Sequence, residues 1–258
     1  LTGASCASLG LVSGTLSCTS TCNFNVSSCI NGGISFCGNN VLNAPEECDA
    51  LTWANGVCDA CNVTCNSGFT EDSNHVCSGG TTTITSCPIQ INNPGTYNLT
   101  SNLTSSGTCV TINSNNVTLD CLNYKITGNG TWYGVYANTK NNITVKNCVV
   151  TNFSWGILFS TVTNSKVLNN NAYNNTYYGV YLAGSSNNNL TNNTAYNPGG
   201  IGIYLMSSSG SNIINSNNLY YNSKGIELNN GPHNNNLTFN NLTNNSANIN
   251  IVSSNFTL

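Results

Sequence analysis

Short pieces in which apolar and polar residues alternate fill the second part of the chain, and they return at a nearly fixed interval. A glycine followed by an apolar residue recurs in steps of 22, 23, 23 and 23 residues, at Gly134, Gly156, Gly179, Gly202 and Gly225. Two more landmarks run in parallel. One is an apolar residue, at Ile143, Val167, Leu190, Ile213 and Leu237. The other is a pair, at Ala172-Tyr173, Ala195-Tyr196, Leu219-Tyr220 and Leu242-Thr243.

Each repeat of about 23 residues therefore holds three short pieces. Their period of two is that of a β-strand, and they are too short for helices. Repeats of this kind stack coil on coil into parallel sheets with strands about 4.8 Å apart. Leucine-rich repeats have a similar length but require a regular leucine scaffold that the chain lacks. The pattern predicts an all-β fold, a three-sheet solenoid.

Asparagine accounts for 53 of the 258 residues, whereas charged residues make up only 5%. Its side chain tolerates the left-handed backbone of turns. Identical residues one coil apart can also join their amides in ladders. We therefore expect the asparagines of the stretch NNNLTNN (Asn187, Asn188, Asn189, Asn192 and Asn193) to be turn and ladder residues.

Two stretches resemble the first coils of NosD-like parallel β-helix proteins. They are INNPGTYNLTSNLTSSGTCVTINSNNVTLDCLNYKITGNGTWYGVY (91–136) and NNITVKN (141–147). The resemblance covers roughly residues 84–258 and implies that the solenoid is a right-handed parallel β-helix.

The chain departs from the NosD-like pattern at Cys121 and Leu122, where small residues are usual, and this departure suggests a disulfide. Cys121 and Cys148 fall nearly one coil apart. Among the three pairings that four cysteines allow, we expect Cys121–Cys148 and Cys87–Cys109.

The composition changes near residue 80. Before that point lie ten of the fourteen cysteines: Cys6, Cys18, Cys22, Cys29, Cys37, Cys48, Cys58, Cys61, Cys65 and Cys77. An even number of cysteines in each part suits closed disulfides in an oxidising compartment. The segment SGGTTTITS (78–86) is typical of a polar junction. We expect a cysteine-rich, disulfide-stapled module over 1–80 and the parallel β-helix over 81–258.

The first part resembles the Myxococcus-type cysteine-rich repeats of secreted proteins. The resemblance rests on GASCASLGLVSGTLSCTSTCNFNVSSC (3–29) and CGNNVLNAPEECD (37–49). The usual acidic turn of these repeats is replaced by CDALT, which weakens a calcium site. The acids Glu46, Glu47, Asp49 and Asp59 offer oxygen ligands for calcium, and the alternative is that they are solvated acids on a disulfide module.

Other metal sites are disfavoured. Cys58 and Cys61 form a CxxC pair, but no second pair stands at zinc-ribbon spacing and His75 has no partner histidine. A copper site in the solenoid is also disfavoured, because Met206 and His233 are the only soft or imidazole ligands there besides the cysteines. We expect neither a metal nor a cofactor in the solenoid.

Catalysis is also disfavoured. Asp120 and Glu227 are the only acids after residue 80, and they are 107 residues or about 4.6 coils apart. That separation is roughly 22 Å along the axis, beyond the reach of a glycosidase pair. Lyases of this shape use an Arg or Lys base with clustered acids, but the chain has no arginine. Lys224 and Glu227 are expected to form a weak surface pair. We expect no enzyme activity.

Several partner classes are excluded. Without arginine or a basic stripe, nucleic acid is an unsuitable partner. No run of 18 apolar residues exists, so we expect no membrane span. A carbohydrate-binding face built from Trp132, Tyr133 and Trp155 is one interpretation of these aromatics; the alternative, which we prefer, is packing around an insertion in the early coils.

Fifteen N-x-S/T sequons occur, at Asn25, Asn62, Asn98, Asn102, Asn116, Asn129, Asn142, Asn152, Asn174, Asn189, Asn192, Asn236, Asn241, Asn244 and Asn255. Composition alone gives about 12, so the count carries little weight; the pattern carries more. Eleven have an apolar middle residue, which in a strand points inward and turns Asn and Thr outward together. Asn142, Asn189 and Asn236 lie two coils apart and should form a row. We expect covalent N-glycans, which would hydrate a surface that carries few charged residues.

The sequence favours a non-catalytic structural protein outside the cell or on its surface, such as a glycosylated subunit of a filament or surface layer or an adhesin stalk. A polysaccharide-binding or polysaccharide-cleaving β-helix is the alternative. The stretch from NINIV to NFTL keeps strand-like alternation in phase with the repeat. We therefore expect head-to-tail self-association, in which the coil near Asn248–Leu258 meets the N-terminal part of the next subunit.

Overall fold

The structure of the protein is a computed structural model that describes residues 81–252 in full and, before them, the backbone of short strands only. The chain divides into two compact units, Leu1–Gly79 and Gly80–Leu258. The strands described in the first unit are β1 (Ser13–Gly14), β2 (Ser17–Cys18), β3 (Phe24–Asn25), β4 (Cys29–Ile30), β5 (Thr52–Trp53), β6 (Gly56–Asp59), β7 (Asn62–Cys65), β8 (Phe69–Glu71) and β9 (Cys77–Gly79). They pair antiparallel, as β1-β4, β2-β3, β5-β6-β7 and β8-β9. The expected disulfides and calcium ligands of this unit depend on side chains, which lie outside what the structure describes before residue 81.

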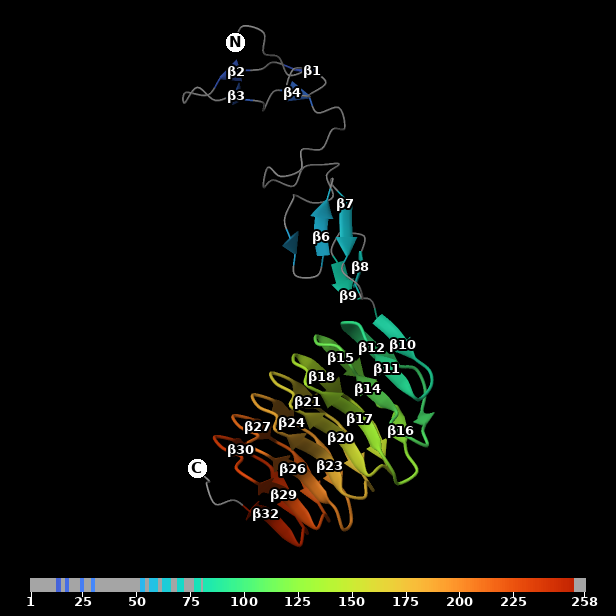
Figure 1. Cartoon of the computed structure of the whole chain (residues 1–258), viewed down its shortest axis with the longest axis vertical. Helices are drawn as coiled ribbons and strands as arrows, with labels where there is room; N and C mark the ends of the chain where they lie inside the picture. The colour runs from blue at the N-terminus through green and yellow to red at the C-terminus, as the bar shows by residue number, and fades with distance from the viewer. Residues whose placement is uncertain are drawn as a thin grey trace. The chain divides into compact units, whose positions relative to one another are not determined.

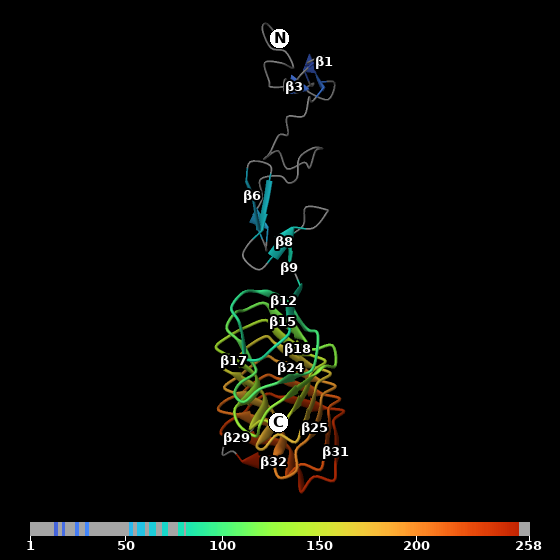
Figure 2. The same ribbon diagram turned by 90° about the vertical axis from the view of Figure 1, so that its right-hand side faces the viewer.

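The second unit is a parallel β-solenoid of three sheets, which confirms the predicted fold (Figure 1). Sheet 1 contains β10 (Thr81–Ile84), β12 (Gly95–Leu99), β15 (Val117–Asp120), β18 (Ile143–Lys146), β21 (Lys166–Leu168), β24 (Asn189–Thr191), β27 (Ile213–Asn215) and β30 (Asn236–Thr238). Sheet 2 contains β11 (Ile89–Ile91), β14 (Val110–Ile112), β17 (Tyr133–Asn138), β20 (Trp155–Ser160), β23 (Tyr178–Ala183), β26 (Ile201–Met206), β29 (Lys224–Asn229) and β32 (Ala247–Val252). Sheet 3 contains β13 (Leu103–Thr104), β16 (Lys125–Thr127), β19 (Val149–Thr151), β22 (Asn171–Tyr173), β25 (Thr194–Tyr196), β28 (Asn218–Tyr220) and β31 (Asn241–Thr243). In the turned view, strands of sheet 2 (β17, β29) lie on the left side of the solenoid and strands of sheet 3 (β25, β31) on the right (Figure 2).

The glycine landmark follows the register of sheet 2. The residues just before the glycines pair from coil to coil as Tyr133, Trp155, Tyr178, Ile201 and Lys224. A Cβ on Gly179 would come within 2.7 Å of the carbonyl oxygen of Gly202 and 2.8 Å of Asn197 Nδ2. Glycine recurs here because the coils approach too closely for a side chain.

The apolar landmark in sheet 1 is partly misaligned. The register aligns Val145, Val167, Leu190, Ile214 and Leu237, in steps of 22, 23, 24 and 23 residues. Thus Ile214 is buried, whereas Ile213 is 46% exposed. The coil of 24 residues absorbs its extra residue in the turn after β26, where Ser207 and Ser208 both have positive φ. The third landmark, in sheet 3, pairs as expected.

Three columns of inward-facing polar residues, mostly asparagines, run through the solenoid, one at each connection between sheets. They are Ser165-Asn188-Asn212-Asn235, Asn170-Asn193-Asn217-Asn240 and Asn175-Asn197-Asn222-Asn245. Asn193 shows the pattern. Its Oδ1 accepts hydrogen bonds from the backbone N–H and from Nδ2 of Asn170, both at 3.0 Å. Its Nδ2 donates to the Val167 carbonyl at 2.8 Å and to Asn217 Oδ1 at 3.0 Å.

The ladders therefore satisfy polar groups that the apolar interior would otherwise leave unpaired. A second set of asparagines occupies exposed left-handed turns, for example Asn152, Asn174 and Asn192 with φ of 59°, 52° and 57°. Asparagine thus has two separate roles. In the Asn-Asn pair at 192–193, the first residue is exposed in the turn and the second is buried in the ladder.

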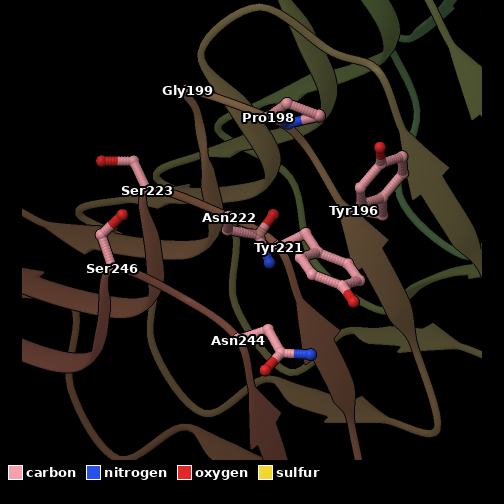
Figure 3. Close-up of a pocket in the computed structure, with 8 residues that line it drawn as sticks. All are labelled: Tyr196, Pro198, Gly199, Tyr221, Asn222, Ser223, Asn244 and Ser246. Carbon is pink, nitrogen blue, oxygen red and sulfur yellow. The ribbon is translucent and has the colours of Figure 1, made fainter.

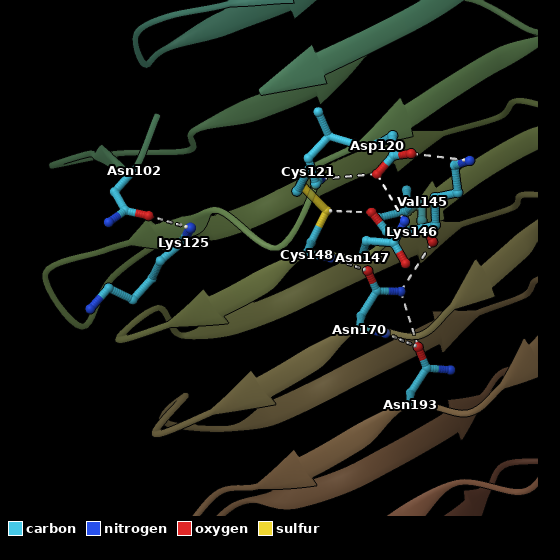
Figure 4. Close-up of a disulfide and its surroundings, with 11 residues drawn as sticks. Asn102, Asp120, Cys121, Lys125, Val145, Lys146, Asn147, Cys148, Asn170 and Asn193 are labelled. Atoms are coloured by element: carbon cyan, nitrogen blue, oxygen red, sulfur yellow. Dashed lines mark hydrogen bonds and ion pairs between the residues drawn. A yellow bond between two sulfur atoms is a disulfide. The ribbon is translucent and has the colours of Figure 1, made fainter. Parts of the chain in front are cut away.

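The structure joins Cys87 to Cys109 and Cys121 to Cys148, the pairs that the sequence favours. Cys148 stands at the start of the second ladder, where its backbone N–H donates to Asn170 Oδ1 at 2.9 Å (Figure 4). The disulfide therefore continues an asparagine column as a covalent link between two early coils.

Candidate functional site

An aromatic face covers the outer side of sheet 2. It consists of Tyr133 and Tyr136 in β17, Trp155 in β20, Tyr178 and Tyr181 in β23, and Tyr204 in β26. These residues stand at matching places in successive repeats, so the register of the coils brings their rings together. The inward neighbours Val135 and Val180 are buried in the core.

The rings form two contiguous groups. Tyr133 stacks on Tyr136 with centroids 4.9 Å apart and lies 5.0 Å from the ring of Trp155. Further along, Tyr204 stacks on Tyr178 at 4.7 Å and on Tyr181 at 5.0 Å. The exposed ring of Tyr177 lies between the groups, 5.5 Å from Trp155 and 6.3 Å from Tyr178. The face therefore spans four coils.

Three tyrosine hydroxyls of this face, on Tyr178, Tyr181 and Tyr204, are partly withdrawn from water. Burial, together with the neighbouring Tyr204, Tyr181, Glu227 and Tyr177, raises the pKa of Tyr178 to about 12. Burial likewise raises the pKa of Tyr181 and Tyr204. Tyr204 accepts a hydrogen bond from Asn229 Nδ2 at 3.1 Å, and the Tyr181 hydroxyl donates to the sulfur of Met206 at 3.2 Å.

An ion pair between a buried glutamate and a half-exposed lysine adjoins the aromatic face. Glu227 follows Tyr204 in the register and is only 4% exposed. Its Oε2 lies 2.8 Å from Lys224 Nζ, and its Oε1 accepts from Asn250 Nδ2 at 3.1 Å. The expectation of a weak surface pair was wrong for Glu227, because neighbouring coils cover the carboxylate. Partners such as Lys224 and Asn250 offset the hydration that a carboxylate loses on burial.

The second acid of the solenoid, Asp120, lies at the end of a strand in sheet 1. It pairs with Lys146 at 3.1 Å and accepts hydrogen bonds from Asn147 Nδ2 and from the Leu122 N–H, each at 2.9 Å (Figure 4). Burial would raise the pKa of Asp120, but the hydrogen bonds from Asn147 and Leu122 and the pair with Lys146 together lower it. The bond to Leu122 also holds that residue in its left-handed conformation (φ 49°).

The two acids do not meet. Asp120 is in β15 of sheet 1, and Glu227 is in β29 of sheet 2. The strand of sheet 1 in the same coil as Glu227 is β27. Four strand spacings separate β15 from β27, so the coils of the two acids are roughly 19 Å apart along the solenoid axis. Within the described residues each acid is bound to a lysine.

The three aromatics that the sequence singled out fall in this region. Tyr133 and Trp155 pair in the register and belong to the aromatic face, whereas Trp132 is 56% exposed in the turn before β17. Sequence reasoning missed Tyr136, Tyr178, Tyr181 and Tyr204. Their signal was present, because YGVY at 133–136 returns at 178–181 and an aromatic residue follows at 204.

The sequons divide by exposure. Among the described residues, ten sequon asparagines are exposed: Asn102, Asn116, Asn129, Asn142, Asn152, Asn174, Asn192, Asn236, Asn241 and Asn244. Asn98 and Asn189 are half-buried, and Oδ1 of Asn98 is buried without a hydrogen-bond partner. The side chains of Asn25, Asn62 and Asn255 lie outside the described residues.

The expected row of Asn142, Asn189 and Asn236 is broken. Asn189 and Asn236 align through Ile213, but the residue that aligns with Asn189 in the coil of Asn142 is Thr144. Asn142 instead occupies a left-handed turn, with φ of 52°. Two coils hold 45 residues between Thr144 and Asn189, not 47, because turn lengths vary.

The fold and its ladders place the protein among the parallel β-solenoids. The chain belongs to the NosD family: the family model described as "Periplasmic copper-binding protein (NosD)" matches residues 66–258, about three quarters of the chain. No curated protein and no solved structure matches the chain. The family and the disulfides together indicate an oxidising compartment outside the cytoplasm. The matched residues do not extend over the region that resembles Myxococcus-type repeats, so that resemblance stays a prediction.

The described residues do not fit the copper of the family's description. They contain no group of three His, Cys, Asp or Glu side chains that could hold a metal ion. The sulfur of Met206 accepts a hydrogen bond from the Tyr181 hydroxyl, and the His233 ring lies against Gly210. The four cysteines of the solenoid form two disulfides. We therefore assign no copper chemistry to this part of the chain. The described part also contains no helix long and apolar enough to cross a membrane.

Proposed function

We propose that the protein is a non-catalytic structural β-solenoid of the cell surface that carries N-linked glycans. The observation that carries this proposal is the division of labour between asparagines. Interior asparagines are engaged in ladders, whereas ten sequon asparagines expose their side chains. With so few charges, the surface needs another source of wetting, and glycans supply it.

The disposition of the acids supports the absence of catalysis. A glycosidase needs two carboxylates no more than about 9.5 Å apart. Asp120 and Glu227 belong to different sheets, and each is held by a lysine. The ladders and ion pairs stabilise stacking of coils and offer no poised acid or base. The geometry therefore supports a passive scaffold.

Glycosylation is tested by site-resolved mass spectrometry of protein purified from its natural source. Enzymatic glycan release in heavy-oxygen water marks each occupied asparagine as a labelled aspartate. We expect label at exposed turn sites such as Asn152 and Asn174. Asn98 is the internal comparison, because it is half-buried within β12 and should be occupied less than the exposed turn sites. Unlabelled exposed sequons throughout the solenoid would refute the glycan part of the proposal.

Head-to-tail assembly into a filament is the second part of the proposal. The edge of a parallel sheet presents backbone donors and acceptors that another chain can pair with. A second copy stacked on a coil edge would continue the three sheets and the asparagine columns. Sedimentation velocity over a wide concentration range tests this. We expect the sedimentation coefficient to increase with protein concentration, also at high salt. A monomer at every concentration would contradict assembly.

Polysaccharide binding is the second candidate, favoured by the aromatic face. Aromatic rings stack on the apolar faces of sugars, and the adjoining amides and hydroxyls can bind sugar hydroxyls. A saccharide chain lying along the axis would meet a new ring at each coil. Affinity electrophoresis in polysaccharide gels is the assay. Retardation that Trp155→Ala abolishes, but Tyr124→Ala on sheet 3's side leaves intact, would favour binding; no retardation would exclude it for the polysaccharides used.

A further inference from the structure

A separate groove lies at the connection between sheets 3 and 2, formed by consecutive coils (Figure 3). Its volume is about 570 Å³. The lining includes the aromatic rings of Tyr196 and Tyr221, the hydroxyls of Ser223 and Ser246, and the amide of Asn244, but no charged side chain. An aromatic surface beside neutral donors and acceptors suits an uncharged sugar ring.

Two of these residues belong to one sequon. Asn244 is the acceptor and Ser246 is the hydroxyl residue of Asn244-Asn245-Ser246, and both are exposed. The middle residue, Asn245, is anchored in the third ladder: its Oδ1 accepts from Asn222 N–H at 2.9 Å, and its Nδ2 donates to the Leu219 carbonyl at 2.8 Å. This anchor turns Asn244 and Ser246 toward the groove.

Tyr221 supplies a fixed ring next to the acceptor. Its N–H donates to the carbonyl of Thr243 at 3.3 Å, so Tyr221 and Asn244 occupy the same left-handed turn in adjacent coils. The ring stands edge-on to Tyr196 (82°) and Tyr220 (79°), yet the residue is 55% exposed. Figure 3 shows the Asn244 amide beside the Tyr221 ring.

We propose that this groove holds the first sugar of a glycan carried by Asn244 of the same chain, stacked on the ring of Tyr221. The proposal rests on the N-glycosylation proposed above and adds a docking place for one particular glycan. Asn174 occupies the equivalent turn of an earlier coil, and there the residue in the preceding coil is Asn152, not an aromatic residue. The Asn174 glycan should therefore be free, which makes it an internal reference.

The test measures how fast an endoglycosidase releases the glycan at each site of the native, full-length protein. Tyr221→Gly removes the ring, and glycine tolerates the φ of 53° at this turn. Phe239→Gly is the matched control, because Phe239 is an 88% exposed aromatic in another turn with φ of 54°. Tyr221→Phe keeps the stacking face.

We expect Tyr221→Gly to speed release at Asn244 by roughly three- to tenfold, the range that one aromatic contact supplies. Release at Asn174 should not change, and Phe239→Gly and Tyr221→Phe should behave as the wild type. Equal release rates at an occupied Asn244 in wild type and Tyr221→Gly would overturn the docking but leave glycosylation standing. An Asn244 that is bare while other sequons are occupied would also overturn it. If no sequon is occupied, the glycan part of the proposed function fails as well.

Discussion

Replacing Asn193 by alanine tests whether the interior ladders hold the coils together. The side chain makes four hydrogen bonds, two through Oδ1 and two through Nδ2, and the residue is 1% exposed. In Asn193→Ala the Asn170 N–H and the Val167 carbonyl lose the partners that the ladder supplies. Asn217 Oδ1 is less affected, because it still accepts the backbone N–H of residue 193.

The cost follows from these two groups. A buried donor or acceptor without a partner costs about 1–3 kcal/mol, so Asn193→Ala should lower the free energy of unfolding by about 2–6 kcal/mol. The sequon at Asn192 is untouched, because its middle residue can be alanine. Asn171→Ala is the control: Asn171 is exposed at the start of β22 and should change the free energy of unfolding by less than about 0.5 kcal/mol.

Equilibrium unfolding in denaturant, followed by far-UV circular dichroism, measures both variants. Asn193→Asp adds a second comparison, because it keeps the acceptor oxygen but loses both donor bonds and places an unpaired charge in the interior. It should be at least as destabilising as alanine. If Asn193→Ala cost no more than Asn171→Ala, the ladders would not be stabilising and the reasoning would fail.

Three more predictions concern packing and ionisation. Gly179→Ala should lower the free energy of unfolding by about 1–3 kcal/mol in denaturant titration, because its Cβ meets the Gly202 carbonyl, whereas Gly107→Ala, with open space around it, should be nearly neutral. The lowered pKa of Asp120 gives stability that is present above its ordinary value of 3.8 and lost as pH falls through the folded pKa. Asp120→Asn should therefore lose less stability than the wild type on acidification, and equal acid sensitivity would contradict the stabilisation of this carboxylate by Asn147, Leu122 and Lys146. The raised pKa of Tyr178 gives stability that is complete below pH 10 and lost as pH rises toward about 12; Tyr178→Phe should therefore be less sensitive to alkali in the same unfolding assay, and equal sensitivity would argue against a buried hydroxyl.

The repeat itself could be read from the sequence, because the glycine landmark reflects a backbone contact that recurs in every coil. Gly134 to Gly225 mark positions where a Cβ would meet the next coil. The solenoid, its three sheets and the length of a coil followed from that landmark and from the two strand-like pieces beside it.

The exact alignment in sheet 1 could not be read, because turn lengths vary without a change in the apolar pattern. One extra residue between Met206 and Ser209 shifts the inward residue from Ile213 to Ile214. In earlier coils, a spacing of 45 residues brings Thr144, and not Asn142, into line with Asn189. A fixed period of 23 residues conceals such shifts.

The candidate site was only partly predictable, since burial depends on neighbours from other coils. Nothing local distinguishes Glu227 as buried, because its cover comes from Tyr204 and Asn250, each about one coil away. The sequence likewise treated Asn192 and Asn193 alike. Only the backbone shows that one occupies the turn and the other the ladder.

Electron microscopy of the protein purified from its natural source, at a resolution that shows sugars, tests the central claim most directly. The account predicts ordered assemblies of stacked solenoids with glycan density rising from exposed turn asparagines such as Asn152, Asn174 and Asn244, and less at the half-buried sequon of Asn98. Dispersed single solenoids with bare turn asparagines would contradict it.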